Sequence, residues 1–298
     1  MQFTDSLMEA IKATSEAVER VMDPHLTVTN ELESRLFEAM RYSFMSGGKR
    51  LRPILVLASS ELFDVPKSRA IRVAAAVEAI HVSSLIHDDL PAMDDDDLRR
   101  GVPSCHKKFD EATAILAGDA FLAVGIELLL DEATHTDAKV RLELTDTLAK
   151  ASGANGMMGG QMIDIIAETQ DLNEREIHRL QALKTGALIS CSVMAGAILA
   201  QADQKSRAAL AAFAHDLGVA FQIADDLLDV EGNVEEMGKA VGKDAAAGKA
   251  TLISIMGLER ARQQAQVLAD QAISHLSIFD EKADLLRALA HFAINRRS

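Results

Sequence analysis

The chain has 298 residues, 48% of them hydrophobic, which is enough for one large domain or two ordinary ones. Its formal net charge of −14 argues against a nucleic-acid partner, because a protein that binds phosphate backbones needs a basic face. One tyrosine, no tryptophan and five prolines favour helix over strand. Cys105 and Cys191 are too few for a disulfide framework and predict a reducing compartment.

The first 22 residues carry acidic side chains early and lack an uninterrupted apolar core, so they do not resemble a secretory signal. The longest uncharged run, residues 185–202, is about long enough to span a bilayer. It is rich in small residues and contains serine, cysteine and glutamine, which favours a buried helix. We therefore expect a cytoplasmic protein without stable membrane insertion.

Two helices are predicted before residue 50. The first carries apolar residues at helical spacing, from Leu7 to Val21, and Asp23-Pro24 ends it. The second is expected to begin near Asn30, a residue that caps helices well. Its apolar stripe is expected to be Leu32, Leu36, Met40 and Phe44.

Helical periodicity continues along the rest of the chain, and no segment shows the sustained alternation of a strand. No linker rich in proline, glycine or serine separates domains. We therefore expect a single all-α domain over residues 1–298, with about ten or more helices. The further helices are predicted at about 53–63, 67–89, 109–131, 136–153, 157–169, 173–200, 204–230, 250–274 and 280–295.

Two acidic clusters interrupt this apolar pattern. HDDLPAMDDDDLRRG (87–101) holds six carboxylates within ten positions, followed by two arginines. Two like charges about 4 Å apart repel by about 1 kcal/mol in water and by about 4 kcal/mol near a protein surface. An acidic run is often a solvated loop, but Asp225, Asp226 and Asp229 form a second cluster inside an apolar helical stretch. The first cluster consists of Asp88, Asp89, Asp94, Asp95, Asp96 and Asp97.

The spacing of these clusters indicates a cation site. His81 and Ser84 share a helix face with Asp88, and Gln222 shares a face with the second cluster. Two such helices facing each other across a cleft would bind hard cations, which leave ligand positions to water or substrate phosphates. A di-iron bundle would need two Glu-x-x-His pairs, an arrangement that the sequence does not supply. Mg²⁺ with a polyphosphate therefore fits better than iron.

Basic residues complete the pattern. Lys49 and Arg52 follow a double glycine, which allows close backbone approach to an anion. Each basic residue alone is equally consistent with a solubilising surface charge. The glycine-lysine stretches lack the spacing of a nucleotide-binding loop, since Gly248-Lys249 is followed by Ala250. The other candidates are Arg99, Arg100, Lys184, Lys239, Lys243 and Lys249.

These motifs, in this order, resemble the signatures of the (E)-prenyl diphosphate synthases. The first acidic motif has the form, with two extra residues, found in bacterial farnesyl diphosphate synthases. The resemblance covers nearly the whole chain and implies an all-α barrel of antiparallel helices around a deep central cavity, usually in a homodimer. The other matching segments are GGKRLRP (47–53), GGQMID (159–164), KTG (184–186), FQIADDLLD (221–229) and GKAVGKD…GKAT (238–251).

The resemblance also implies a role for each matching residue. The implied metal ligands are Asp88, Asp89 and Asp94 on one wall and Asp225, supported by Asp226 and Asp229, on the other. The implied allylic diphosphate site consists of Arg99, Lys184, Thr185, Gln222, Lys239 and Lys249, with Gln161 and Asp164 nearby. The implied isopentenyl diphosphate site consists of Lys49, Arg52, His81 and Arg100.

The implied reaction joins isopentenyl diphosphate head-to-tail to dimethylallyl or geranyl diphosphate and releases pyrophosphate. Mg²⁺, with Mn²⁺ as a possible substitute, is the implied cofactor. Cationic groups stabilise the departing anion, and a dry cavity protects the allylic cation from water. Holding the second alkene in line makes the condensation effectively unimolecular.

Product length is the point where the sequence departs from the pattern. Bacterial farnesyl diphosphate synthases usually have a bulky aromatic residue five positions before the first motif, and this chain has Ser83, followed by Ser84. One helical turn rises about 5.4 Å, so a missing floor residue could admit a further isoprene unit. General similarity favours the C15 product, farnesyl diphosphate. Ser83 favours C20 or longer, unless a side chain elsewhere, such as from the 109–131 helix, forms the floor.

Two rival interpretations remain. A terpene cyclase shares the implied fold and first motif, but its second motif is usually of an Asn/Ser/Glu type, unlike DDLLD (225–229). A non-catalytic subunit of a heteromeric synthase tends to lose one acidic motif, and this chain carries both.

Overall fold

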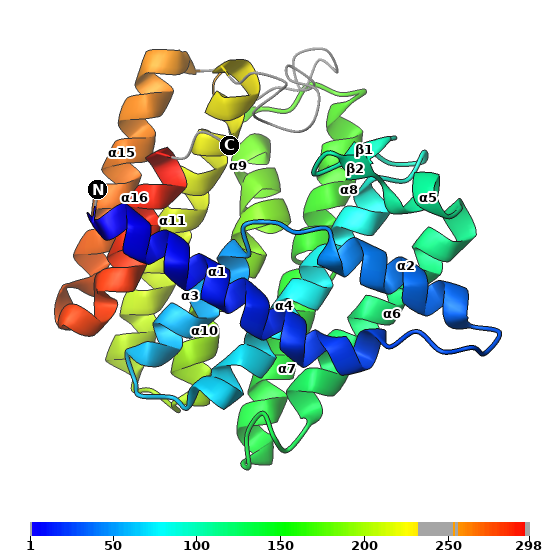
Figure 1. Cartoon of the computed structure of the whole chain (residues 1–298). Helices are drawn as coiled ribbons and strands as arrows, with labels where there is room; N and C mark the ends of the chain where they lie inside the picture. Colours follow the sequence, from blue (N-terminus) through cyan, green and yellow to red (C-terminus); the bar gives the residue numbers. More distant parts are fainter. Residues whose placement is uncertain (1, 232–252, 254–255, 296–298) are drawn as a thin grey trace.

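A computed structural model describes residues 2–231, 253 and 256–295 (Figure 1). The long helices of the first half of the chain are α1 (Gln2–Met22), α2 (Ser34–Met45), α3 (Leu51–Glu61), α4 (Lys67–Asp88), α6 (Glu111–Leu130) and α7 (Ala138–Ser152). They are followed by α8 (Met157–Ala167), α9 (Glu174–Gln181), the π turn η2 (Ala182–Gly186), α10 (Ala187–Leu199), α11 (Gln204–Glu231), α15 (Leu258–His275) and α16 (Asp284–Asn295). The short elements are η1 (Asp23–Leu26), α5 (Cys105–Lys108), η3 (Leu276–Ile278), η4 (Glu281–Ala283) and the hairpin of β1 (Leu98–Arg99) and β2 (Val102–Pro103).

The predicted all-α class is confirmed, and the start of the second helix is corrected. The helix begins at Ser34 rather than near Asn30, and Leu32, predicted to be buried, is fully exposed. Thr29 Oγ1 accepts the backbone N–H of Glu31 at 3.3 Å, and Ser34 N–H donates to Glu31 O at 3.1 Å. Residues 29–34 therefore form turns, because a threonine side chain can compete with the helix for backbone donors.

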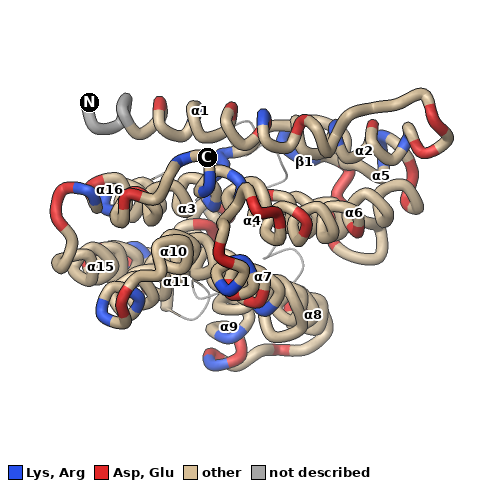
Figure 2. The backbone as a smooth tube through the Cα atoms, turned by 90° about the horizontal axis from the view of Figure 1, so that it is seen from below, with Lys and Arg blue, Asp and Glu red and all other residues tan. Residues whose placement is uncertain are grey.

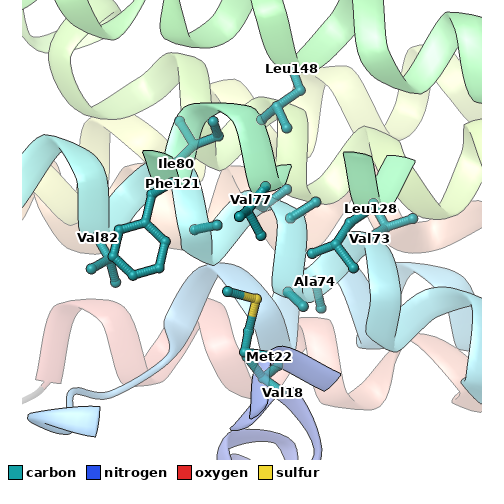
Figure 3. Packing of buried hydrophobic residues seen from close by; sticks show 14 of the residues in the cluster. Val18, Met22, Val73, Ala74, Val77, Ile80, Val82, Phe121, Leu128 and Leu148 are labelled. Atoms are coloured by element: carbon teal, nitrogen blue, oxygen red, sulfur yellow. The ribbon is translucent and has the colours of Figure 1, made fainter. Parts of the chain in front are cut away.

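α4 is the central helix of the first half of the molecule. Buried side chains occur around most of its surface, because it packs against α1, α3 and α6. Figure 3 shows Val77 and Ile80 of α4 near Phe121 of α6, with Met22 of α1 on the opposite side. Burying a large apolar side chain contributes about 1.5–3 kcal/mol, so this packing fixes the axis of the helix that ends at the first acidic motif.

The second half of the fold is built around α10 and α11. α10 packs on α3 and α11, and α11 packs on α15 and α16, which lie side by side at one end of the molecule (Figure 1). Phe213 and Leu217 of α11 are buried in this layer. The same packing fixes α11, the helix that carries the second acidic motif.

Charged residues of both signs are interspersed around the described part of the chain (Figure 2). Three helical segments are long and apolar enough to cross a membrane by length and composition: Lys67–Asp88, Glu111–Leu130 and Glu174–Leu199. In their most apolar windows, 72%, 44% and 56% of the residues are buried inside the fold. Packing against neighbouring helices thus accounts for most of the apolar character of the first segment and for less than half of that of α6.

Candidate active site

A cavity of about 940 Å³ lies between α4, α8, α9, η2 and α11. Arg52 of α3 and the loop after α4 complete its wall. Of the residues predicted for the site, the cavity is lined by Arg52, His81, Ser83, Ser84, Asp88, Asp94, Arg99, Gln161, Asp164, Lys184, Thr185, Gln222, Asp225, Asp226 and Asp229. Residues separated by almost 180 positions in the chain therefore meet at one site.

The first acidic wall stands at the end of α4. Asp88 is the last residue of that helix, and the backbone N–H of Asp94 donates to Asp88 O at 2.9 Å, which folds the loop back toward the helix. The carboxylates of Asp88 and Asp94 form no hydrogen bond or ion pair with other described residues. Burial raises the pKa of Asp88 to about 7, with smaller contributions from Lys184, which lowers it, and from Asp94, which raises it. A cation bound beside this carboxylate would favour its charged form and lower its pKa.

Asp89 has a different environment from Asp88. Its side chain is almost fully buried outside the cavity and bonds to Arg99, whose Nε donates to Asp89 Oδ1 at 2.9 Å. Arg99 Nη2 also lies 3.3 Å from Asp96 Oδ2. Burial raises the pKa of Asp89, and the bond to Arg99 opposes that rise. In this arrangement Asp89 orients Arg99 toward the cavity.

The second acidic wall is one face of α11. Asp225, Asp226, Asp229 and Gln222 all line the cavity from it, as their helical spacing predicts. Asp226 is held at both oxygens: Gln222 Nε2 donates to Oδ1 at 2.8 Å, and Gln181 Nε2 donates to Oδ2 at 3.2 Å. The side-chain amides of Gln222 and Gln181 therefore hold the Asp226 carboxylate in place.

Basic and hydroxyl groups enter the cavity from the π turn. Lys184 Nζ donates to Asp164 Oδ2 at 2.6 Å, and Thr185 Oγ1 donates to Gln222 Oε1 at 2.8 Å. The lysine side chain is only partly exposed, and Asp164 is mostly buried. Lys184 is thus hydrogen-bonded to α8, and Thr185 is hydrogen-bonded to α11.

A cationic corner lies at the start of α3. Arg52 Nη1 lies 3.3 Å from His81 Nε2, and Arg100 donates to Gly47 O. Burial, and then the positive charges of Arg52 and Arg100, hold the pKa of His81 well below its usual range. Burial lowers the pKa of Arg100 to about 10. Lys49 and Arg100 do not line the cavity, and Lys49 is exposed.

The apolar part of the cavity is rich in methionine. Ser83 is buried in its wall, and Ser84 donates its hydroxyl to His81 O at 2.8 Å. His87 lies against α6, with Nε2 3.1 Å from Ile115 O. Among the described residues, the lining comes from helices other than α6. The remaining apolar lining consists of Leu85, Met93, Met157, Met158, Met162, Ile165, Ala167, Ile177 and Leu180.

Several lining residues had no signal in the sequence that separates them from ordinary helix surface. Gln181 is one example, because it ends a helix in which most residues are polar. His87 is another, because the carboxylates that follow it gave the motif its meaning. Gln161 was predicted. The residue is 7% exposed, and its buried side-chain amide has no hydrogen-bond partner among the described residues. A buried amide without a partner costs about 1–3 kcal/mol, so this group is available to a ligand. Lys239 and Lys249 lie outside the described residues.

The donor set fits a hard divalent metal. Carboxylates from α4, its following loop and α11 line one cavity, and Mg²⁺ prefers such oxygens together with substrate phosphates. A further group, Asp95, Asp97 and His106, has potential ligand atoms within 4.8 Å of one another. Asp97 in that group is already paired with Lys107 at 2.7 Å.

An all-α cavity with an acidic wall on each side and cationic groups between them defines a diphosphate-handling enzyme of the isoprenoid synthase class. The family model "Polyprenyl synthetase" matches residues 33–289, and the chain belongs to this family.

Known relatives agree with this assignment. The farnesyl diphosphate synthase of Escherichia coli is 43% identical over 303 residues, covering 99% of each chain. A geranylgeranyl diphosphate synthase of Cyanophora paradoxa is 41% identical, covering 88% of each chain. The crystal structure of an FPP/GFPP synthase from Zymomonas mobilis has a TM-score of 0.89 at 49% identity, covering 97% of this chain and 99% of the other.

Proposed function

We propose that the protein condenses isopentenyl diphosphate with dimethylallyl or geranyl diphosphate and releases pyrophosphate. The observation that carries this proposal is the meeting of Asp88 and Asp94 with Asp225 and Asp229 around a cavity that also contains Lys184. Mg²⁺, or Mn²⁺ in its place, would be held by these carboxylates. When bound, the metal supplies positive charge that stabilises the departing pyrophosphate.

The residues of the π turn and of the first motif would hold the allylic diphosphate. Lys184 and Arg99 are oriented by Asp164 and Asp89, so their charges are fixed before the substrate arrives. Groups fixed in this way stabilise developing negative charge without reorganising at the moment of reaction. We assign Thr185 and Gln222 to the same site, and Lys239 and Lys249 remain predictions.

The cationic corner would hold isopentenyl diphosphate. Arg52 and His81 line the cavity, and Arg100 lies close enough to His81 to lower its pKa. Lys49 remains a prediction. His81, whose pKa is lowered in the unliganded protein, can donate a hydrogen bond to a phosphate oxygen, and the arginines beside it supply positive charge. The apolar lining of the cavity would exclude water from the cation.

The preferred product is farnesyl diphosphate, with geranylgeranyl diphosphate or a longer product as the alternative. The farnesyl diphosphate synthase relative supports the first product, and the geranylgeranyl diphosphate synthase relative supports the second. Ser83 lies in the cavity wall and is small, which supports the longer product.

The protein is proposed to work as a cytoplasmic homodimer without membrane insertion or nucleic-acid partners. Support for the dimer comes from α6, where Ile115, Leu116, Ile126 and Leu130 are between 42% and 57% exposed. Large aliphatic side chains exposed on one helix face are typical of a protein–protein interface.

Pyrophosphate release tests the proposal. Purified protein with Mg²⁺, isopentenyl diphosphate and geranyl diphosphate should release pyrophosphate and form a C15 product that chromatography identifies. Asp88→Ala and Asp225→Ala should abolish turnover while circular dichroism shows unchanged helical content, because both carboxylates end on the cavity surface. A wild-type protein that releases no pyrophosphate would instead support a non-catalytic subunit of a heteromeric synthase.

A further inference from the structure

The π turn η2 lies between two helices that approach its backbone at glycines. On one side, a methyl group at Gly160 of α8 would overlap the backbone nitrogen of Lys184 and lie 2.6 Å from its Cα. On the other side, a methyl group at Gly218 of α11 would lie 3.3 Å from the Cα of Gly186. Only a residue without a side chain permits the first approach, and the second is tighter than an ordinary van der Waals contact.

The same two helices also hold the side chains of the turn. Asp164, four residues after Gly160, accepts from Lys184 Nζ at 2.6 Å. Gln222, four residues after Gly218, accepts from Thr185 Oγ1 at 2.8 Å. Residues four apart share a helix face, so each helix presents a glycine to the backbone and a polar group to a side chain.

We infer that Gly160 and Gly218 are positioning residues that place Lys184 and Thr185 for binding the allylic diphosphate. This inference rests on the proposed function. The glycines set the separation between the turn and each helix, and the polar residues one helical turn further on then reach the two side chains. A π turn is rare and lacks the regular α hydrogen bonds, so packing from both sides holds it in place.

The alternative is that both glycines serve helix packing alone. In that case their substitution would lower stability without changing substrate binding by the folded fraction. The chain supplies matched controls for both positions. A methyl group at Gly196 would lie 2.5 Å from Ser59 O, as severe a backbone overlap as at Gly160. A methyl group at Gly125 would lie 3.2 Å from the backbone oxygen of Ala76, comparable with the backbone contact at Gly218. Neither control lines the cavity.

The experiment compares Gly160→Ala with Gly196→Ala, and Gly218→Ala with Gly125→Ala. Melting temperature, the KM for each substrate, kcat, and calorimetric binding of pyrophosphate with Mg²⁺ are measured for all four. Within each pair, the two substitutions should lower the melting temperature by a similar amount. Gly160→Ala should raise the KM for geranyl diphosphate about tenfold and weaken pyrophosphate binding by a similar factor, because a displacement of about 1 Å disrupts a preorganised site. Gly218→Ala should raise the KM for geranyl diphosphate and weaken pyrophosphate binding by about threefold, since its overlap is smaller.

The KM for isopentenyl diphosphate should stay within about twofold in all four variants, and both controls should keep near-wild-type constants per folded molecule. The inference is overturned if Gly160→Ala and Gly218→Ala bind geranyl diphosphate and pyrophosphate as their controls do. If Gly160→Ala shows no cooperative melting, the comparison of Gly218→Ala with Gly125→Ala tests the inference. If the wild type releases no pyrophosphate but binds it with Mg²⁺, the proposed function fails, and the binding measurement alone decides the inference.

Discussion

At the scale of single residues, the cavity shifts an acid and a base in opposite directions for the same reason. Burial raises the pKa of Asp88 to about 7 and holds the pKa of His81 well below its usual range. Both shifts favour the neutral form of the side chain in the unliganded protein. A metal beside Asp88 and a diphosphate beside His81 would each favour the charged form, so ligand binding should be accompanied by proton exchange with solvent.

The shift of Asp88 predicts a pH-dependent cost of folding in the metal-free protein. The pKa of Asp88 is about 7 in the folded state and 3.8 for an ordinary aspartate, so the folded state binds more protons between these values, and stability falls as pH rises from about 4 to 7. Asp88→Asn removes the cost. In chelator, the variant should be more stable than the wild type at pH 8, by about 2–4 kcal/mol, and should differ little at pH 4. Thermal unfolding at the two pH values measures this.

Asp97→Asn is the control for that measurement. Asp97 is exposed, and the hydrogen bond from Lys107 lowers its pKa. Its substitution should therefore give no stabilisation at pH 8. An equal effect of Asp88→Asn at both pH values would contradict the assigned pKa.

Ser83 carries the prediction on product length. It is 1% exposed by surface area yet contributes to the cavity wall, so a large ring there would project into the cavity. Ser83→Tyr should shorten the main product by one isoprene unit, read by chromatography of products made from labelled isopentenyl diphosphate. Ser83→Ala, which changes the volume little, should leave the product unchanged. A folded Ser83→Tyr enzyme with the wild-type product would place the end of the tunnel elsewhere.

At the scale of elements, a buried ion pair ties the start of α3 to the middle of α4. Arg50 has left-handed backbone angles, and its Nη1 donates to Glu78 Oε1 at 2.6 Å with both side chains almost fully buried. Arg50 also stacks over Phe44, 4.6 Å from the ring centroid. This attachment fixes the first turn of α3 and therefore the position of Arg52.

Removing Glu78 leaves the buried Arg50 guanidinium without its close carboxylate, because the other one, Glu19 Oε1, lies 3.9 Å from Nη2 and is partly exposed. Glu78→Ala should lower the free energy of unfolding by about 3–5 kcal/mol, measured by chemical denaturation. Replacing both partners with apolar residues, as in the double variant Arg50→Met with Glu78→Leu, should recover most of the loss. A double variant as unstable as Glu78→Ala would show that the arginine stabilises the fold through Phe44 and the backbone instead.

Elements and site residues could be predicted from the sequence to different extents. The helix predicted over 67–89 is observed as Lys67–Asp88, because its apolar residues and its flanking Pro66 and acidic run are unambiguous. The turns before Ser34 depend on a threonine side chain, and the hairpin at 98–103 is too short to show alternation.

Within the site, the paired aspartates could be found because charge inside an apolar pattern is conspicuous. The run predicted over 173–200 contains the KTG segment (184–186), and the structure shows a π turn there, at Ala182–Gly186. Its register, and the bond from Gln181 to Asp226, depend on the distance between helices remote in sequence. A single sequence does not contain that distance.

At the scale of the whole molecule, α6 contrasts with α4. Both helices are apolar, but α4 is enclosed on most sides, whereas α6 exposes a row of large aliphatic side chains that includes Leu116 and Ile126. Because His87 packs on the backbone of α6, this exposed face lies one helix away from the first acidic motif.

The proposed homodimer predicts that a charge on this face separates the subunits. Leu116→Glu should shift the protein from dimer to monomer in analytical ultracentrifugation, because an unpaired charge would be buried at the interface. Leu142→Glu is the control, since Leu142 is also exposed but lies on α7. Dissociation by both substitutions, or by neither, would place the interface elsewhere.

The π turn also sets how the chain length between residues 174 and 199 can change. A π turn contains one residue more than a regular α turn, and each residue of an α-helix rotates its successors by about 100°. The wider π turn takes up that extra residue, so α9 and α10 keep nearly the rotational phase of one continuous helix. A residue inserted or deleted elsewhere between 174 and 199 would instead rotate α10 by about 100° and remove its buried face from α3 and α11. Deleting one residue within η2 would keep that packing and remove the turn that presents Lys184 and Thr185, so the helix would survive and the site would be lost.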